Sequence, residues 1–317
     1  MDNLTHGLVG LTLSAIRKTN DVEYREPLNQ RAIFWSTGLG SQFPDLDIVF
    51  RFISDVSYLE NHRGLTHSLA GLMIIPLIIT LLVRYFFPMV KGRIIYFWAW
   101  LATGVHIFLD ILTSYGTMAL WPINSIRYAW DILAIIDPVI IVLLFAAMVI
   151  ARRIPYNKRK VYATVLALVI GYISTRTLLQ HQLVQTVTQN FKPGTSITET
   201  SVIPTLMGYN KWHLVVETKD KYYLGTASVW PWSFNLDEEL PKSHNQVIAA
   251  ASQAPAVQVF NQFARYPYAE IRKKDTVFQV TWADLRYKFG KHNPFSAFVN
   301  LDENLRVIDY GLGQGKQ

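Results

Sequence analysis

Long apolar runs dominate the first 180 residues of the chain. Four of them approach the roughly 20 residues that a helix needs to cross the hydrocarbon core of a bilayer, and they cover residues 68–87, 94–112, 132–151 and 161–179. Two shorter runs, residues 4–16 and 32–43, precede them and are too short to span comfortably. The pattern therefore predicts an α-helical integral membrane bundle with four spans and two short N-terminal helices.

The pattern changes after residue 180. Residues 212–230 contain two β-rich runs around a polar turn, and residues 276–287 and 296–310 repeat this hairpin pattern. Residues 244–264 are predicted to be helical, with an interruption at Pro255. We therefore expect a membrane domain over residues 1–180 and a soluble α+β domain over residues 190–317.

Composition narrows the chemistry that the chain can perform. It has no cysteine, so it can form neither a disulfide framework nor a thiolate metal site. Any bound metal must use His, Asp or Glu, which favours zinc, manganese, iron or magnesium. The net charge of +7 does not require a nucleic-acid partner, because the basic residues of a membrane protein mark its cytoplasmic loops.

Basic loops predict the topology of a multi-pass protein in the cell membrane. Residues 152–160 carry five Lys or Arg among nine residues, and the loop 84–93 carries three, so both are expected in the cytoplasm. The chain then threads so that residues 45–67, residues 113–131 and the C-terminal domain lie outside the cytoplasm.

This threading gathers histidines and aspartates that are far apart in the sequence at one face of the membrane. Ionisable residues near a span are costly to bury, so they tend to mark function. We interpret seven of them as ligands of one divalent metal site, with zinc preferred and manganese as the alternative: His6, Asp45, Asp47, His62, His67, His106 and Asp110.

Local spacing supports this interpretation. His106 and Asp110 are four residues apart, so they share one face of a helix. Asp45 and Asp47 are two residues apart after Pro44, and an extended segment would place both carboxylates on one side.

Simpler roles compete at individual positions. A single intramembrane histidine can merely bond a neighbouring helix. Asp137 precedes Pro138 and has the signature of a helix N-cap, and Thr66 could cap the third apolar helix. Whether Asp131 and Asp137 join the site stays open, as does the choice between a polar pocket and a plain turn for residues 113–122. His181, His213, His244 and His292 lack metal spacing and are expected to be structural or solvated.

Five ordered motifs carry a family resemblance: MDNLTHGLVG, PDLD, HRGLTHSL, HIFLDILTSYGT and DILAIIDP. Over roughly residues 1–140 the chain resembles the YdjM-like family of bacterial membrane-bound metal-dependent hydrolases. The resemblance implies an integral membrane protein with a catalytic metal centre. More distantly, the His and Asp pattern is similar to zinc-dependent phospholipase C, which hydrolyses phosphodiesters with a zinc cluster. A second His-x-x-x-Glu pair is missing, which puts a full three-zinc cluster in doubt.

The function expected from the sequence is hydrolysis of a phosphoester bond in a lipid or lipid-linked substrate at the bilayer. Asp45 or Asp47 would act as general base, and Arg63 would stabilise charge on a phosphoryl oxygen. A transporter would need charged residues near the bilayer midplane in several spans, and here they crowd one end. The remaining alternative is a membrane-anchored binding or regulatory protein with a structural metal.

Overall fold

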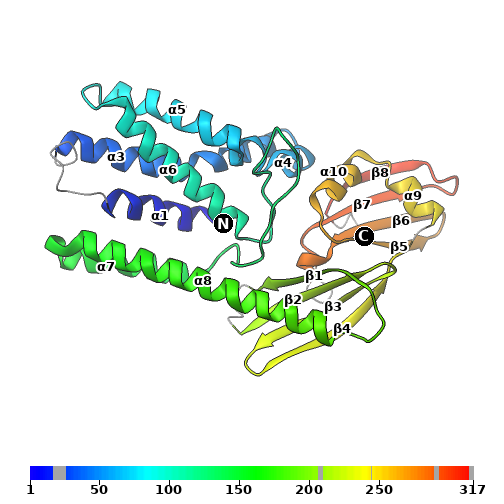
Figure 1. Cartoon of the computed structure of the whole chain (residues 1–317). Helices are drawn as coiled ribbons and strands as arrows, with labels where there is room; N and C mark the ends of the chain where they lie inside the picture. The colour runs from blue at the N-terminus through cyan, green and yellow to red at the C-terminus, as the bar shows by residue number, and fades with distance from the viewer. Residues whose placement is uncertain (17–25, 206–209, 244, 289–292, 314–317) are drawn as a thin grey trace. The chain divides into compact units, whose positions relative to one another are not determined.

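The computed structural model describes residues 1–16, 26–205, 210–243, 245–288 and 293–313 (Figure 1). The chain divides into two compact units. One contains Met1–Asp47 and Arg63–Leu178, and the other contains Ile48–His62 and Leu179–Gln317. His244 and His292, which we expected to be structural or solvated, fall outside the described residues.

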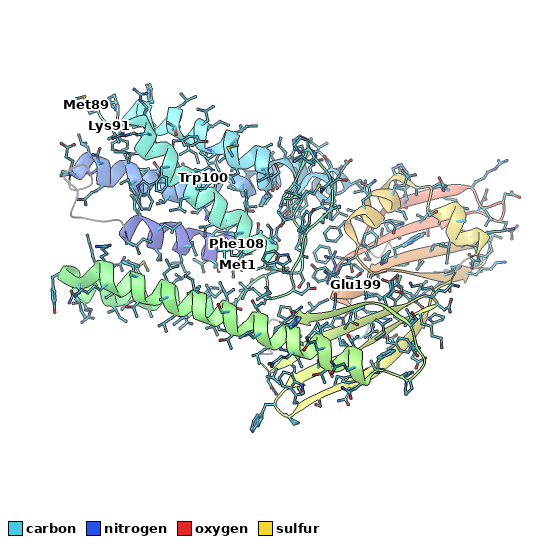
Figure 2. All side chains as sticks on the ribbon, viewed as in Figure 1. Met1, Met89, Lys91, Trp100, Phe108 and Glu199 are labelled. Atoms are coloured by element: carbon cyan, nitrogen blue, oxygen red, sulfur yellow. The ribbon has the colours of Figure 1, made fainter. Side chains whose placement is uncertain are left out.

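The first unit is a bundle of helices. Its helices are α1 (Asn3–Ile16), α3 (Pro27–Gly40), α5 (Leu69–Phe86), α6 (Gly92–Ile111), α7 (Pro138–Arg153) and the first part of α8 (Lys158–Asn190). Apolar cores hold it together, of which α1, α6, α7 and α8 share one and α3, α5 and α6 share another. The bundle has two distinct ends, one near Met89 and Lys91 and the other near Met1 and Phe108 (Figure 2).

Three helices in the described part of the chain are long and apolar enough to cross a membrane: Leu69–Phe86, Gly92–Ile111 and Pro155–Asn190. They correspond to the first, second and fourth predicted spans. Many of their apolar side chains, such as Leu81 and Phe108, are exposed on the bundle. A bilayer would cover these side chains, since hydrocarbon solvates them as a protein core does.

The third predicted span is shorter than the sequence pattern indicates. Residues 132–137 are not helical, and α7 begins at Pro138. Asp137 is its N-cap, because its Oδ1 accepts hydrogen bonds from the backbone N–H groups of Val139 and Ile140. The 16 residues of α7 rise roughly 24 Å at about 1.5 Å per residue, less than the 30 Å hydrocarbon core. The predicted start at residue 132 is therefore wrong, and the N-cap reading of Asp137 is confirmed.

Two other helix boundaries differ from the prediction for identifiable reasons. α3 begins at Pro27 rather than at residue 32, because proline is favoured in the first helical turn. α8 continues to Asn190 instead of ending at residue 179. Leu183 and Val187 of its last turns pack against Trp212 in a core of the second unit, which stabilises the helix beyond its apolar run.

The second unit contains two antiparallel four-stranded sheets. The first has the order β1 (Ile197–Pro204), β2 (Lys211–Thr218), β3 (Lys221–Val229) and β4 (Trp232–Pro241). The second has the order β5 (Pro267–Lys274), β6 (Val277–Asp284), β7 (Ser296–Leu301) and β8 (Val307–Leu312). The predicted hairpin in 212–230 is β2–β3, and the other two predicted segments supply β6, β7 and β8.

Short helices complete this unit. α9 (Gln246–Ala251) and α10 (Pro255–Phe263) are separated just before Pro255, as predicted. α4 (Asp55–Asn61) packs against α10. His213 has a structural role here: its Nε2 lies 2.9 Å from the backbone oxygen of Leu285, and burial lowers its pKa.

Candidate metal site

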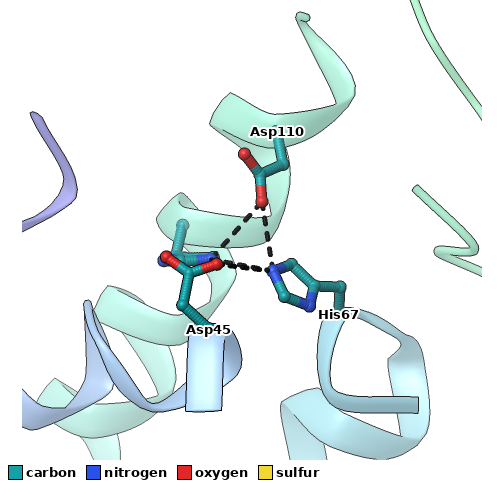
Figure 3. A group of neighbouring side chains, drawn as sticks. Asp45, His67 and Asp110 are labelled. Carbon is teal, nitrogen blue, oxygen red and sulfur yellow. Dashed lines mark hydrogen bonds and ion pairs between the residues drawn. The ribbon is translucent and has the colours of Figure 1, made fainter. Parts of the chain in front are cut away.

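Three segments of the first unit bring the candidate ligands together. Asp45 and Asp47 lie on the 3-10 helix Phe43–Phe52, and His67 ends the 3-10 turn Leu65–His67. His106 and Asp110 lie one turn apart on α6. One donor atom from each of Asp45, His67, His106 and Asp110 falls within 4.8 Å of the other three (Figure 3). These four residues form the metal group.

The metal group centres on Nε2 of His67. This atom lies 3.1 Å from Nε2 of His106, 3.2 Å from Oδ2 of Asp110 and 3.3 Å from Oδ1 of Asp45. Nε2 of His106 is 3.4 Å from the same Asp110 oxygen and 3.7 Å from Oδ1 of Asp45. His67, His106 and Asp110 are fully buried, whereas the side chain of Asp45 is 12% exposed. Asp45 is therefore the member closest to solvent.

The second nitrogen of each imidazole is engaged away from the metal group. Nδ1 of His106 lies 2.9 Å from the backbone oxygen of Ser41. A carbonyl can only accept, so Nδ1 carries the proton and Nε2 presents its lone pair to the group. Nδ1 of His67 lies 2.9 Å from Oγ1 of Thr66 and 3.3 Å from Oδ2 of Asp47. Such outer partners orient the imidazole ligands of protein metal sites.

Asp47 contacts a different nitrogen of His67 from the one that Asp45 contacts. Its Oδ2 accepts hydrogen bonds from the backbone N–H of Arg63, at 2.9 Å, and from the hydroxyl of Thr66, at 3.2 Å. The prediction that residues 45–47 are extended is wrong, because they lie on a 3-10 helix. Such a helix has about three residues per turn, so side chains two residues apart point in different directions. Asp45 therefore meets one nitrogen of His67 while Asp47 meets the other.

Thr66 forms hydrogen bonds within the candidate metal site and does not cap the helix that follows it. The alternative that Thr66 caps this helix is excluded, because Ser68 is the N-cap of α5 and its hydroxyl accepts from the backbone N–H of Gly71 at 3.2 Å. The hydroxyl of Thr66 instead joins Asp47 to His67. Sequence reasoning missed this role because Ser and Thr next to a helix start give the same signal whether or not they cap.

Arg63 is buried behind Asp110. Its Nη2 lies 2.9 Å from Oδ1 of Asp110, and its Nη1 donates to Oγ1 of Thr113 at 3.0 Å. The guanidinium also lies over the ring of Tyr115, with Cζ 4.8 Å from the ring centroid. Its φ of 56° is in the left-handed region, and its backbone oxygen accepts from Met118. Arg63 thus links the turn before His67, the end of α6 and the loop that follows.

His6 lies beside the metal group. Its ring stacks on that of His106 with centroids 3.6 Å apart, and its Nε2 lies 3.4 Å from Oδ1 of Asp110. Neither ring nitrogen has a hydrogen-bond partner, although the side chain is buried. The α-amino group of Met1 pairs with the same oxygen of Asp110. Sequence inspection cannot find this contact, since it depends on how α1 packs.

Comparison with known proteins identifies the family of the chain. The sequence model of the YdjM inner membrane protein family matches residues 1–183, more than half of the chain. This chain belongs to that family. The resemblance drawn from the five motifs is thereby confirmed, and the family and the apolar helices together support a membrane location.

The second half of this YdjM-family chain has its own match. The model of the YfhP C-terminal alpha/beta plait domain matches residues 246–316, which contain α9, α10 and the sheet β5–β8. The uncharacterized protein YfhP of Bacillus subtilis (strain 168) is 27% identical over 311 residues, covering 97% of this chain and 93% of YfhP. No solved structure matches the chain.

Five predicted or considered ligands are not among the four grouped donors, and His6 and Asp47 are two of them. His62 belongs to the second unit, where it follows α4 and its ring stacks on Tyr58 with centroids 4.6 Å apart. Asp137 caps α7, and its Oδ2 accepts from the hydroxyl of Tyr172 at 3.0 Å. Asp131 is buried and has a φ of 57°. The sequence could not separate these residues from the ligands, because all of them flank apolar runs.

The metal group fits a divalent cation on structural grounds. A tetrahedral ion with ligands at about 2.0–2.2 Å separates neighbouring donors by roughly 3.3–3.6 Å. Every donor pair that includes a histidine is spaced by 3.1 to 3.7 Å, which brackets that range, and the two carboxylate donors lie within 4.8 Å of each other. Oδ2 of Asp110, one of these donors, is buried and accepts no hydrogen bond, a costly arrangement that a cation relieves. Imidazole with carboxylate is a ligand set used by zinc and manganese.

Electrostatics favour an ionised Asp45. Burial raises the pKa of this carboxyl group, but the contact with the His67 imidazole and the nearby charges outweigh burial, so its pKa falls below the ordinary value. An ionised carboxylate is the form that binds a cation.

Proposed function

We propose that the chain is a membrane-bound metal-dependent hydrolase whose ion is held by Asp45, His67, His106 and Asp110. The observation that carries this proposal is the set of four donors within 4.8 Å, three of them fully buried, contributed by three separate segments. Zinc is the ion we favour, because two imidazoles and two carboxylates at tetrahedral spacing suit it, and manganese is the alternative.

The residues around the ion would have different roles in the reaction. A bound divalent cation supplies a Lewis acid and a water molecule that ionises near neutral pH. Asp45 is the most exposed member of the group, and Oδ2 of this carboxylate accepts no hydrogen bond, so we assign it the role of proton acceptor. Asp47 orients His67 through Nδ1, and Arg63 holds Asp110 in place.

The substrate class follows from the location of the metal group. His106 and Asp110 occupy the last turns of α6, a helix apolar enough to cross a bilayer, and His67 immediately precedes α5, another such helix. A lipid or lipid-linked phosphoester would place its phosphate at the ion and its apolar chains in the bilayer. A nucleic acid has no such chains, and we do not propose one.

One observation favours a second candidate, a membrane-anchored binding or regulatory protein with a structural metal. If all four donors bind a single ion, its tetrahedral shell is closed, as in structural zinc sites, whereas a catalytic ion keeps a position open for water. The two candidates differ in whether Asp45 stays bound when water is present.

Metal analysis tests the proposal directly. We expect full-length protein purified in detergent to retain about one equivalent of zinc or manganese by elemental mass spectrometry, and His106→Ala to lose it, because the ring supplies one of the four donors of the metal group. His181→Ala is the matched control, since His181 is exposed on α8 and pairs with Gln185. Equal metal content in the wild type and both variants would contradict the proposal.

We also propose that the metal group and the C-terminal domain face the outside of the cell membrane, on the basis of the basic loops. The chain has no cysteine, so single cysteines can be introduced on a clean background. Ser243→Cys should react with a membrane-impermeant thiol reagent in intact cells, and Tyr156→Cys, at an exposed position in the basic loop 152–160, should react only after lysis. The opposite labelling pattern would invert the topology.

A further inference from the structure

The turn between β3 and β4 exposes two tryptophans on the second unit. Trp230 is 83% exposed and Trp232 is 41% exposed, and Pro231 between them is exposed as well. A tryptophan buries about 150–250 Å² when it is covered, so two exposed ones on a single turn are a large apolar surface to leave in water. Such surfaces mark interaction sites. We call residues 229–232 the tryptophan turn.

Hydrogen bonds hold the tryptophan turn in one conformation. The hydroxyl of Ser228 donates to the backbone oxygen of Pro231 at 2.6 Å and lies 3.1 Å from the hydroxyl oxygen of Ser233. The side-chain amide of Asn210 donates to the backbone oxygen of Trp230. The two rings are therefore presented by an ordered turn.

Contacts with α8 give the direction in which the turn points. The helix lies along the sheet β1–β4 (Figure 1). Nε1 of Trp232 donates to Oγ1 of Thr186 at 2.9 Å, whereas Glu239, near the other end of β4, pairs with Lys192, which comes later in α8. β4 therefore runs along α8 in the same sense, and the turn that precedes β4 points back toward the apolar run of the helix.

The tryptophan turn lies at the level of lipid headgroups. Leu179 is the last residue of the apolar run of α8 and belongs to the second unit, as the sheet does. From Leu179 to Thr186 the helix rises roughly 10 Å at about 1.5 Å per residue. Trp230 precedes Trp232 by two strand residues, which bring it back by up to roughly 7 Å. It therefore falls roughly 3–10 Å beyond the apolar run, and the headgroup layer occupies roughly 5–8 Å outside the hydrocarbon core.

The residues around the turn also suit a headgroup layer. Tryptophan is enriched there, because its ring is apolar and its N–H can donate a hydrogen bond. Residues 226–235 carry no charge, and Lys211, which pairs with Ser228 across β2 and β3, is exposed. The acidic residues of β4 begin only at Asp237, in the second half of the strand. This end of the sheet is therefore uncharged or basic, as contact with anionic headgroups requires.

We propose that the tryptophan turn inserts into the headgroup layer of the bilayer and anchors the C-terminal domain on the membrane surface. The leaflet is the one at the C-terminal end of the span of α8. The bilayer is the occupant because the turn continues the surface by which α8 meets lipid, where Leu178 is 64% exposed. This inference rests neither on the metal group nor on hydrolase activity.

Site-specific fluorescence of the full-length protein in vesicles tests this placement. The chain has no cysteine, so Lys211→Cys gives one labelling site beside the turn and keeps both tryptophans. Asp220→Cys is the matched control, because Asp220 is exposed in the turn between β2 and β3, at the opposite end of the same sheet. Both variants carry the same environment-sensitive fluorophore, and the vesicles contain phosphatidylcholine, phosphatidylglycerol and a lipid with a quencher on its headgroup in both leaflets.

We expect a blue-shifted emission and several-fold stronger quenching for the label in Lys211→Cys than for the label in Asp220→Cys. Equal quenching in the two variants would overturn the proposal. A blue shift in Lys211→Cys without quenching by lipid would also overturn it, because it would show that protein and not the bilayer covers the turn.

A second substitution tests the tryptophan itself. Trp230→Ser, added to Lys211→Cys, should weaken the quenching, because the anchoring ring is lost while the buried core is untouched. Tyr310→Ser is the control, since it removes an exposed aromatic side chain from β8 of the other sheet and should leave the quenching unchanged. Circular dichroism verifies that both variants fold. Unchanged quenching in Trp230→Ser would show that α8 alone sets the depth and would overturn the anchoring role.

Discussion

Asp110→Asn is expected to remove both the bound metal and any phosphoester hydrolysis. Asp110 is fully buried, and its Oδ2 faces Nε2 of both His67 and His106. Asparagine keeps the shape and one acceptor oxygen but loses the charge that balances a divalent ion. Since changes in residues around metal ligands already cost about 10–100-fold in affinity or activity, we expect a loss of more than about 100-fold here. Lipid-phosphate and generic phosphodiester substrates, assayed in detergent with added zinc or manganese and with chelator, provide the measurement.

Two further variants make this result interpretable. Asp110→Asn also leaves Arg63 and the Met1 amino group without their carboxylate partner, so it could fail by unfolding. Asp45→Asn removes a ligand charge from the partly exposed side of the metal group and should lose activity while the protein still folds. Asp55→Asn is the matched control, because this carboxylate is exposed and pairs with Arg51. Hydrolysis that survives chelator and both site variants would reject metal catalysis and favour the binding-protein alternative.

Arg63→Lys is expected to lower metal affinity by about 10–100-fold. The planar guanidinium donates to Asp110 and to Thr113 at the same time and lies over Tyr115, which a single ammonium group cannot reproduce. Asp110 would then lose one of the contacts that orient it toward His67 and His106, beside those from Met1 and His6. Competition against a chromophoric chelator measures the affinity of the purified variant.

Arg51→Lys is the matched control for this substitution. Arg51 is an exposed arginine that follows the aspartate pair and meets Asp55 at 3.5 Å, so its replacement should leave metal affinity unchanged. Arg63→Lys keeps the positive charge, and lysine pays the same conformational energy as arginine for the left-handed φ of 56°. A loss of metal affinity would therefore result from the loss of the planar guanidinium group. An unchanged affinity in Arg63→Lys would show that Arg63 does not position Asp110.

Much of the fold could be predicted because local patterns decide it. Apolar runs of about 20 residues predicted α5 and α6, and the break before Pro255 separated α9 from α10. The strands β1, β4 and β5 were not predicted. The residues of β4 are mostly exposed, so its sequence lacks the alternation of buried and exposed residues that predicts a strand. This segment forms a strand because it pairs with β3.

The candidate site shows where sequence information ends. The spacing of His106 and Asp110 by itself determined that both share one face of a helix, because four residues complete about one helical turn. Residue types and order also determined the family resemblance. The sequence alone could not distinguish the grouped donors Asp45 and His67 from Asp47 and His62, since all four precede the same apolar helix.

Only the tertiary structure decided those roles. The 3-10 helix turns Asp45 toward Nε2 of His67 and Asp47 toward Nδ1, and the backbone oxygen of Ser41 fixes the ring of His106. His62 instead stacks on Tyr58 in the other unit. The physical reason is that metal ligation depends on distances of a few ångströms between atoms from different segments, and helix packing sets those distances, whereas sequence patterns specify only which residues share a face or an end of one element.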